Sequence, residues 1–110
     1  MSVNIDGKTI ATNNEGYLEK VDDWSTDIAQ YIADTENIVL TEAHWEIIHL
    51  LRQFYHHFEL SPAMRPLVKY TAQQLGKEKG NSIYLLTLFP PSPAKIASKI
   101  AGLPRPANCL

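Results

Sequence analysis

The chain has 110 residues, 45% of them hydrophobic and 20% charged, and a formal net charge of −2, so it fits one globular domain and excludes disorder throughout. No stretch approaches the roughly 18 consecutive apolar residues that cross a bilayer, and the first twenty positions lack a basic flank before an apolar run, which disfavours membrane insertion and secretion. The single cysteine excludes disulfide frameworks and multi-thiolate metal sites and favours a reducing, cytoplasmic location without metal or organic cofactor.

The N-terminal segment predicts a small β-hairpin. Apolar and polar residues alternate over residues 3–10 on both sides of Asp6-Gly7, a dipeptide that readily adopts the positive φ angles of a tight turn. After a loop around residues 13–16, the apolar side chains recur at helical spacing from Trp24 to Ile32, with Asp23 or Ser25 available as the cap. We therefore expect a short first helix after the hairpin.

A longer helix is predicted to begin after Thr41 and to extend to about Glu59. Its apolar stripe should make it the central core helix, and the members of the stripe are Ile47, Leu51, Phe54 and Phe58, broadened by Trp45, Ile48, Leu50 and Tyr55.

The next segment predicts two short helices joined by a glycine-containing turn. Ser61-Pro62 is typical of a cap followed by proline at the first helical position, and Pro66 then implies a break or restart. This helix should end near Gly76, and Asn81 begins a second apolar helix over 81–89. The pair resembles a helix-turn-helix, although its second helix has few side chains suited to base edges.

The last helix is predicted to begin at Ser92-Pro93 and to end at Gly102, a residue that can close a helix in the left-handed conformation. Beyond it, Pro104 and Pro106 favour extended backbone. We therefore expect an α+β, mainly α fold: a small N-terminal β-hairpin packed on about five helices with a helix-turn-helix-like pair. Residues 1–102 would form a single domain, and residues 103–110, called the arm below, would form a mobile C-terminal extension.

Most candidate sites of chemistry have a structural interpretation. All four histidines fall on the predicted central helix, at His44, His49, His56 and His57. No two of them are three or four residues apart, so a surface or packing role is favoured over a metal site. The aromatic residues of the helical stripes indicate core packing rather than a stacking surface for bases. No glycine pattern indicates phosphate binding or a serine nucleophile.

The charges are unevenly distributed along the chain. Residues 1–78 hold all twelve acidic side chains and six basic ones, whereas residues 79–110 hold only basic ones: Lys79, Lys95, Lys99 and Arg105. This basic third is suited to an acidic partner or to nucleic acid, but an ordinary solvated surface is equally consistent with it.

Cys109 is the remaining candidate for chemistry. It lies next to the last residue, where buried structural cysteines are rare, and the arm could carry it about 20 Å from Leu103 at about 3.1 Å per residue. No histidine lies near it in sequence to act as its base, so a partner would complete its activation. These residues alone leave a reactive and an incidental thiol both open.

The C-terminal run Lys99-Ile-Ala-Gly-Leu-Pro-Arg-Pro-Ala-Asn-Cys109-Leu110 resembles the end of the TusE and DsrC family of sulfur-carrier proteins. The resemblance continues through most of the chain, in segments 16–18, 44–46, 61–63, 79–82 and 88–90. It implies that Cys109 is the catalytic residue and accepts a sulfur as a persulfide, with Gly102, Pro104, Arg105 and Pro106 shaping its delivery. A second cysteine of the DsrC branch corresponds to Ser98 here, which implies a single-thiol mechanism.

The resemblance also implies partners. A TusE-like protein would be a sulfurtransferase that takes sulfur from a TusBCD-like complex and passes it to an MnmA-like tRNA 2-thiouridylase, with or without bound tRNA, for wobble-uridine thiolation. Lys95, Lys99 and Arg105 could guide the arm to an acidic surface or to the tRNA backbone. The alternatives are a single-cysteine DsrC-like protein of sulfur trafficking or regulation, and a helix-turn-helix nucleic-acid-binding protein.

Overall fold

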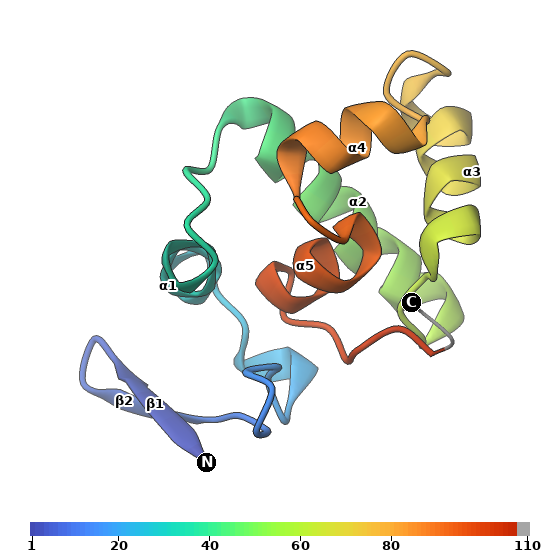
Figure 1. The fold of residues 1–110 in the computed structure, drawn as a ribbon. Coiled ribbons are helices and arrows are strands. Elements are labelled where there is room, and N and C mark those ends of the chain that lie inside the picture. Colours follow the sequence, from blue (N-terminus) through green and yellow to red (C-terminus); the bar gives the residue numbers. More distant parts are fainter. Residues whose placement is uncertain (108–110) are drawn as a thin grey trace.

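The computed structural model describes residues 1–107, and Asn108, Cys109 and Leu110 lie outside the described residues. The predicted mainly helical fold with an N-terminal hairpin is confirmed (Figure 1). Its elements in chain order are β1 (Ser2–Ile5), β2 (Lys8–Ala11), the short 3-10 helix η1 (Val21–Asp23), α1 (Thr26–Thr35), α2 (Glu42–Phe58), α3 (Met64–Leu75), α4 (Ser82–Leu88) and α5 (Pro93–Ile100).

The hairpin has the turn that its sequence predicts. Strands β1 and β2 pair antiparallel, with Ile5 opposite Lys8, and the two residues between them have φ angles of 50° (Asp6) and 79° (Gly7). Two successive positive φ angles match the twist of the flanking strands, so Asp-Gly closes the loop without splaying them. The hairpin packs beside α1 at one end of the molecule (Figure 1).

Most helix boundaries follow the predicted caps. The Ser25 hydroxyl accepts a hydrogen bond from the amide of Ile28 at 3.3 Å, and α1 begins directly after Ser25. Helix α2 begins after Thr41, as expected, and α4 begins after Asn81, whose side chain accepts the amide of Tyr84 at 2.8 Å. Each of these two side-chain caps, Ser25 and Asn81, supplies an acceptor to an amide that has no partner within its own helix.

The predicted start of α3 is wrong. Pro62 precedes the helix rather than opening it, and α3 begins at Met64 and contains Pro66 in its first turn. Proline is tolerated there because the first amides of a helix have no acceptor within the helix. Pro66 therefore causes no break, and Ser61 is free for another contact.

The prediction that α2 is the central core helix is also wrong, because α5 packs against α1, α2, α3 and α4 (Figure 1). The small side chains Ala94, Ala97 and Ser98 are almost completely buried and let the surrounding helices approach α5 closely. Helix α2 contributes much of the core, but Phe58, predicted within its apolar stripe, has 54% of its surface exposed. It is the last residue of α2.

Within residues 1–107, every helix is too short or too polar to span a lipid bilayer.

Candidate functional site

The residues expected to shape delivery of the thiol lie at the end of α5 and directly after it. Gly102, Pro104, Arg105 and Pro106 are described by the structure, whereas Cys109 lies outside the described residues. The site therefore comprises the first part of the arm, Leu103–Ala107, and the side chains that hold it.

Helix α5 ends in a motif that depends on Gly102. The amide of Gly102 donates to the carbonyl of Lys99 at 3.1 Å, and the amide of Leu103 donates to the carbonyl of Ser98 at 3.0 Å. Gly102 has a φ of 74°, the left-handed conformation that this pair of bonds requires, as the sequence predicts. Leu103 is fully buried, so the first residue of the arm is anchored in the core.

Two side chains from distant parts of the chain bind the last carbonyls of α5. The indole nitrogen of Trp24 donates to the carbonyl of Ile100 at 2.9 Å, and Arg52 Nη1 donates to the carbonyl of Ala101 at 2.7 Å. The Arg52 guanidinium also lies 4.2 Å from the centre of the Trp24 ring. A cation at this position stabilises the partial negative charge of the helix C-terminus, and both donors satisfy carbonyls that have no partner within the helix.

Arg52 is partly buried, and desolvation lowers the pKa of its guanidinium while the nearby Asp22 opposes that shift. The guanidinium is still charged at neutral pH, because the pKa of an arginine side chain lies far above neutrality. Arg52 also bridges to the N-terminal part of the chain, where its Nη2 donates to the carbonyl of Val21 at 3.4 Å. The start of the arm is thus fixed to both α2 and η1.

The arm is held at two further points. The Ser61 hydroxyl donates to the carbonyl of Pro104 at 2.5 Å, which attaches the arm to the connection between α2 and α3 (Figure 1). Arg105 Nη1 lies 3.3 Å from Glu15 Oε2, and about half of each side chain is exposed. Pro106 is buried, whereas Pro104 is exposed. The mobility of the arm and its boundary at Gly102 stay predictions.

A groove of about 640 Å³ lies beside the start of the arm. Leu103 and Pro104 line one part of it, residues 19–22 a second, and the C-terminal half of α2 a third, where Arg52 and His56 face the groove. The lining of this groove is largely polar and charged, and the fold leaves the groove open next to the arm.

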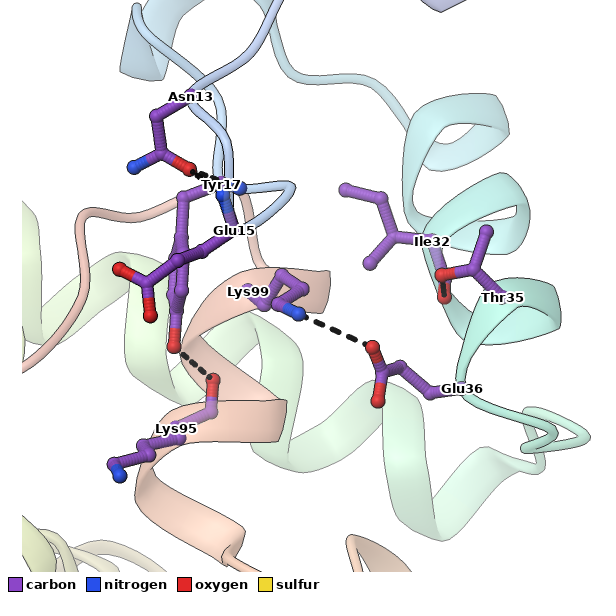
Figure 2. Close-up of polar contacts among 8 residues, drawn as sticks. All are labelled: Asn13, Glu15, Tyr17, Ile32, Thr35, Glu36, Lys95 and Lys99. Atoms are coloured by element: carbon purple, nitrogen blue, oxygen red, sulfur yellow. Dashed lines mark hydrogen bonds and ion pairs between the residues drawn. The ribbon is translucent and has the colours of Figure 1, made fainter. Parts of the chain in front are cut away.

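Loop 13–17 lies between the arm and α5, and its Glu15 pairs with Arg105 of the arm. Asn13 Oδ1 accepts the amides of Glu15 and Tyr17 at 2.9 and 3.1 Å, which fixes the loop. Figure 2 shows the Tyr17 hydroxyl pointing to the carbonyl of Lys95, to which it donates at 3.3 Å, while Lys99 Nζ lies 5.2 Å from the centre of the Tyr17 ring. The loop therefore packs on α5 while its Glu15 binds the arm.

The basic third of the chain pairs with the acidic part within the molecule. The three ion pairs among residues 1–107 are Lys79–Glu46 at 2.7 Å, Lys99–Glu36 at 3.1 Å and Arg105–Glu15 at 3.3 Å. The Lys99–Glu36 pair is the least exposed of them, so the ammonium of Lys99 is engaged within the fold. Arg105 and Lys95 are better placed to meet a partner: the Arg105 pair is exposed, and the Lys95 ammonium points away from the Lys99–Glu36 pair in Figure 2.

The histidines have structural or surface positions, as expected. His44 is buried. Its Nε2 lies 2.8 Å from the carbonyl oxygen of Leu88, and its Nδ1 accepts a hydrogen bond from the amide of Thr41. The other three, His49, His56 and His57, are exposed. Residues 1–107 contain no group of three or more histidine, cysteine, aspartate or glutamate side chains arranged to hold a metal.

The helix-turn-helix-like pair is present as α3 and α4, but α4 lacks the side chains that read DNA. It carries no charged residue, and its exposed side chains include Ile83 and Leu86. Recognition of duplex DNA needs cations for the phosphates and polar groups for the base edges. The side chains of α4 therefore do not support duplex reading by this pair.

The sequence does not indicate which side chains hold the end of α5 and the arm. It places Trp24 in core packing and Ser61 at a helix cap, and it gives Arg52 no role. The contacts of Trp24, Ser61 and Arg52 join positions 76, 43 and 49 residues apart, respectively, and no local pattern indicates such pairs.

The sequence pattern of the family described as "DsrC like protein" matches residues 4–110. Among curated proteins, "Sulfurtransferase TusE" of Pectobacterium atrosepticum is 53% identical over 105 residues, with 96% of each chain covered. "Sulfurtransferase TusE homolog" of Haemophilus influenzae is 52% identical, with 98% of this chain and 99% of that protein covered.

Two solved structures extend the comparison to the fold. The NMR structure of Allochromatium vinosum DsrC has a TM-score of 0.90 and 46% identity, and each chain is covered completely. The crystal structure of the oxidized gamma-subunit of the dissimilatory sulfite reductase (DsrC) from Archaeoglobus fulgidus has a TM-score of 0.84 and 33% identity, again over both complete chains.

Proposed function

The chain belongs to the family of DsrC-like proteins and shares the sulfurtransferase role of its TusE relatives, and we propose that Cys109 carries the sulfur as a persulfide. The observation that supports this assignment most strongly is the near-complete match to TusE proteins in a chain whose single cysteine is the penultimate residue. The anchored start of the arm and the groove beside it are consistent with delivery of that thiol to another protein.

The chemistry needs one thiol. In loading, the Cys109 thiolate attacks the outer sulfur of a donor persulfide, the donor S–S bond breaks, and the donor cysteine leaves as a thiolate. The transferred sulfur keeps its proton, so there is no net oxidation. In unloading, an acceptor thiolate attacks the outer sulfur on Cys109 in the same way. Both steps require access to Cys109 and a leaving thiolate.

Ser98 supports a mechanism without an intramolecular disulfide. It occupies the position at which the resemblance to DsrC implies a second cysteine, and it is fully buried in α5. Among residues 1–107 its hydroxyl has no hydrogen-bond partner, so no polar contact of the described residues depends on it. A hydroxyl forms no disulfide, so sulfur held on Cys109 must leave to another molecule.

The pathway proposed for this carrier is the tRNA 2-thiouridine relay, as the TusE name of the relatives suggests. A TusBCD-like complex would load Cys109, and an MnmA-like tRNA 2-thiouridylase would receive the sulfur. We place this relay in the cytoplasm, where tRNA is modified and a free thiol stays reduced. Arg105 is the arm cation that would guide delivery, since its ion pair with Glu15 is exposed and exchangeable.

The carrier role is tested by intact-mass analysis after incubation with a small-molecule persulfide such as glutathione persulfide. The wild-type chain should gain one sulfur atom, and Cys109→Ser should gain none. Equal gains by both proteins, or none by the wild type, would refute the assignment.

The relay is tested separately by reconstitution with a TusBCD-like complex, an MnmA-like enzyme and unmodified tRNA. Thiolated uridine should form only when Cys109 is present. A carrier that is loaded normally but supports no tRNA thiolation would instead indicate the alternative role in another branch of sulfur trafficking.

A further inference from the structure

The outward face of α3 carries cations and no acidic side chain. Leu67 and Thr71 are the buried residues of this helix. Arg65, Lys69 and Gln73 are exposed and follow one another at intervals of four residues, on the side of the helix opposite to the buried pair. Neighbouring members are about 6 Å apart along the helix axis. We call Arg65, Lys69 and Gln73 the basic face.

The two cations of the basic face are not compensated within the described part of the chain. The three ion pairs among residues 1–107 use the cations Lys79, Lys99 and Arg105. Arg65 and Lys69 belong to none of these pairs, and α3 itself contains no carboxylate. The basic face is therefore a region of uncompensated positive charge, which attracts anions.

The basic face begins close to the base of the arm. Arg65 follows Ser61 by four residues, and the Ser61 hydroxyl donates to the carbonyl of Pro104, where the arm reaches the connection between α2 and α3 (Figure 1). Cys109 follows Pro104 by five residues, which span at most about 18 Å when fully extended. A molecule that binds the basic face is therefore held near the sulfur that the proposed function assigns to Cys109.

The groove on which the arm also borders has a different charge. Three exposed carboxylates line it, and none of them belongs to an ion pair among residues 1–107: Glu19, Asp22 and Glu59. Its cations are Lys20 and Arg52, and the Arg52 guanidinium already binds backbone carbonyls. Of these two surfaces next to the arm, the basic face is the one that suits a polyanion.

We propose that the basic face binds the sugar-phosphate backbone of the tRNA that receives the sulfur, an inference that rests on the proposed function. Arginine, lysine and glutamine side chains are common donors to phosphate oxygens. The basic face offers no aromatic or large apolar side chain of the kind that anchors protein–protein interfaces, so RNA fits it better than an acidic protein surface does. Phosphate contacts carry no sequence information, so this surface orients the tRNA and the acceptor enzyme selects it.

The test compares Arg65→Gln/Lys69→Gln with the control Lys8→Gln/Lys20→Gln, which removes the same charge. Lys8 and Lys20 are exposed and lie in β2 and directly before η1, away from α3 (Figure 1). Glutamine is a good helix former, so α3 should keep its stability. Binding of each full chain is measured between 50 and 200 mM salt, to the MnmA-like enzyme of the proposed function carrying unmodified tRNA and to the same enzyme without tRNA.

The expected signature is a change in salt dependence. Each phosphate that a cation neutralises contributes about 0.7 to 0.9 to the slope of log Kd against log salt, so the double variant should have a slope lower by about 1.4 to 1.8. The ratio of its Kd to that of the wild type should therefore fall about 7- to 12-fold between 50 and 200 mM salt. The control should keep the wild-type slope, and without tRNA both variants should bind the enzyme as the wild type does.

An unchanged slope in the double variant would overturn the RNA contact, as would an equal change in the control or no binding of the wild type to the tRNA-bearing enzyme. The same loss in the absence of tRNA would also overturn it, because the basic face would then bind the acceptor protein. Loading by glutathione persulfide involves no RNA and should be equal in all the variants. Failure of the wild type to be loaded would instead refute the proposed function, and since the binding measurement needs no sulfur, the two failures are distinguishable.

Discussion

Replacing Gly102 by alanine tests whether the end of α5 is fixed by its backbone and side-chain contacts. The φ of 74° places Gly102 in the left-handed region, which costs a residue with a Cβ about 1–2 kcal/mol. The new Cβ would also lie 2.3 Å from Cδ1 of Trp24 and 2.7 Å from its Cγ. The indole cannot move aside freely, because it donates to Ile100 and lies under the Arg52 guanidinium.

Such overpacking costs about 1–3 kcal/mol, so Gly102→Ala should lower the free energy of unfolding by about 2–5 kcal/mol. For a domain of this size each kcal/mol corresponds to about 4 °C, which gives a fall in Tm of roughly 8–20 °C. Gly7→Ala is the matched control, since Gly7 has a φ of 79° and a Cβ added there would meet nothing beyond its chain neighbours within 4 Å. This control measures the cost of the left-handed backbone conformation without a steric clash.

Urea and thermal unfolding followed by circular dichroism measure both variants. Gly102→Ala should be less stable than Gly7→Ala by about 1–3 kcal/mol, the part contributed by the Trp24 contact. Equal losses in the two variants would show that the indole yields without cost, and the rigid attachment of the end of α5 at Trp24 would then be wrong.

Three further predictions follow from other contacts. Asp6→Asn should bring the pKa of Asp27 down towards 3.8, measured by carboxyl NMR, because the hydrogen bond and charge of Asp6 raise that pKa. Since a raised carboxyl pKa makes the folded state gain stability as the pH falls through it, the variant should lose that acid-side gain. His44→Ala should cost about 2–3 kcal/mol in urea unfolding, because the buried ring joins α2 to the end of α4. Gly80→Ala should cost about 3 kcal/mol, because its Cβ would lie 2.3 Å from the backbone of Ala72, and a loss below that of Gly7→Ala would contradict the packing of this turn.

The uneven charge distribution shows how tertiary structure changes the meaning of a sequence pattern. The basic C-terminal third suggests an acidic partner or nucleic acid, yet three of its four cations pair with glutamates of the acidic part. These pairs join residues 33, 63 and 90 positions apart. Much of the segregated charge is therefore compensated within the molecule, and Lys95 and Arg105 are the cations best placed for an external role.

Local physical chemistry was sufficient for most elements of this fold, with the start of α3 as the exception. Several of its features act within a few residues, so the sequence alone predicts them: the Asp-Gly turn, the caps at Ser25 and Asn81, and the left-handed Gly102. The penultimate position of Cys109 is likewise a property of the sequence, and it supplied the functional hypothesis through the family resemblance.

Packing decided what local patterns do not encode. Helix α5 takes the centre because its small side chains admit four neighbouring helices, and Phe58, although it belongs to the apolar stripe of α2, is left exposed at the end of that helix. Trp24 and Arg52 hold the end of α5, and Ser61 holds the arm, through contacts with residues far away in the chain. Such pairs depend on how complete helices pack together, so only the assembled structure brings these donors to the carbonyls that they bind.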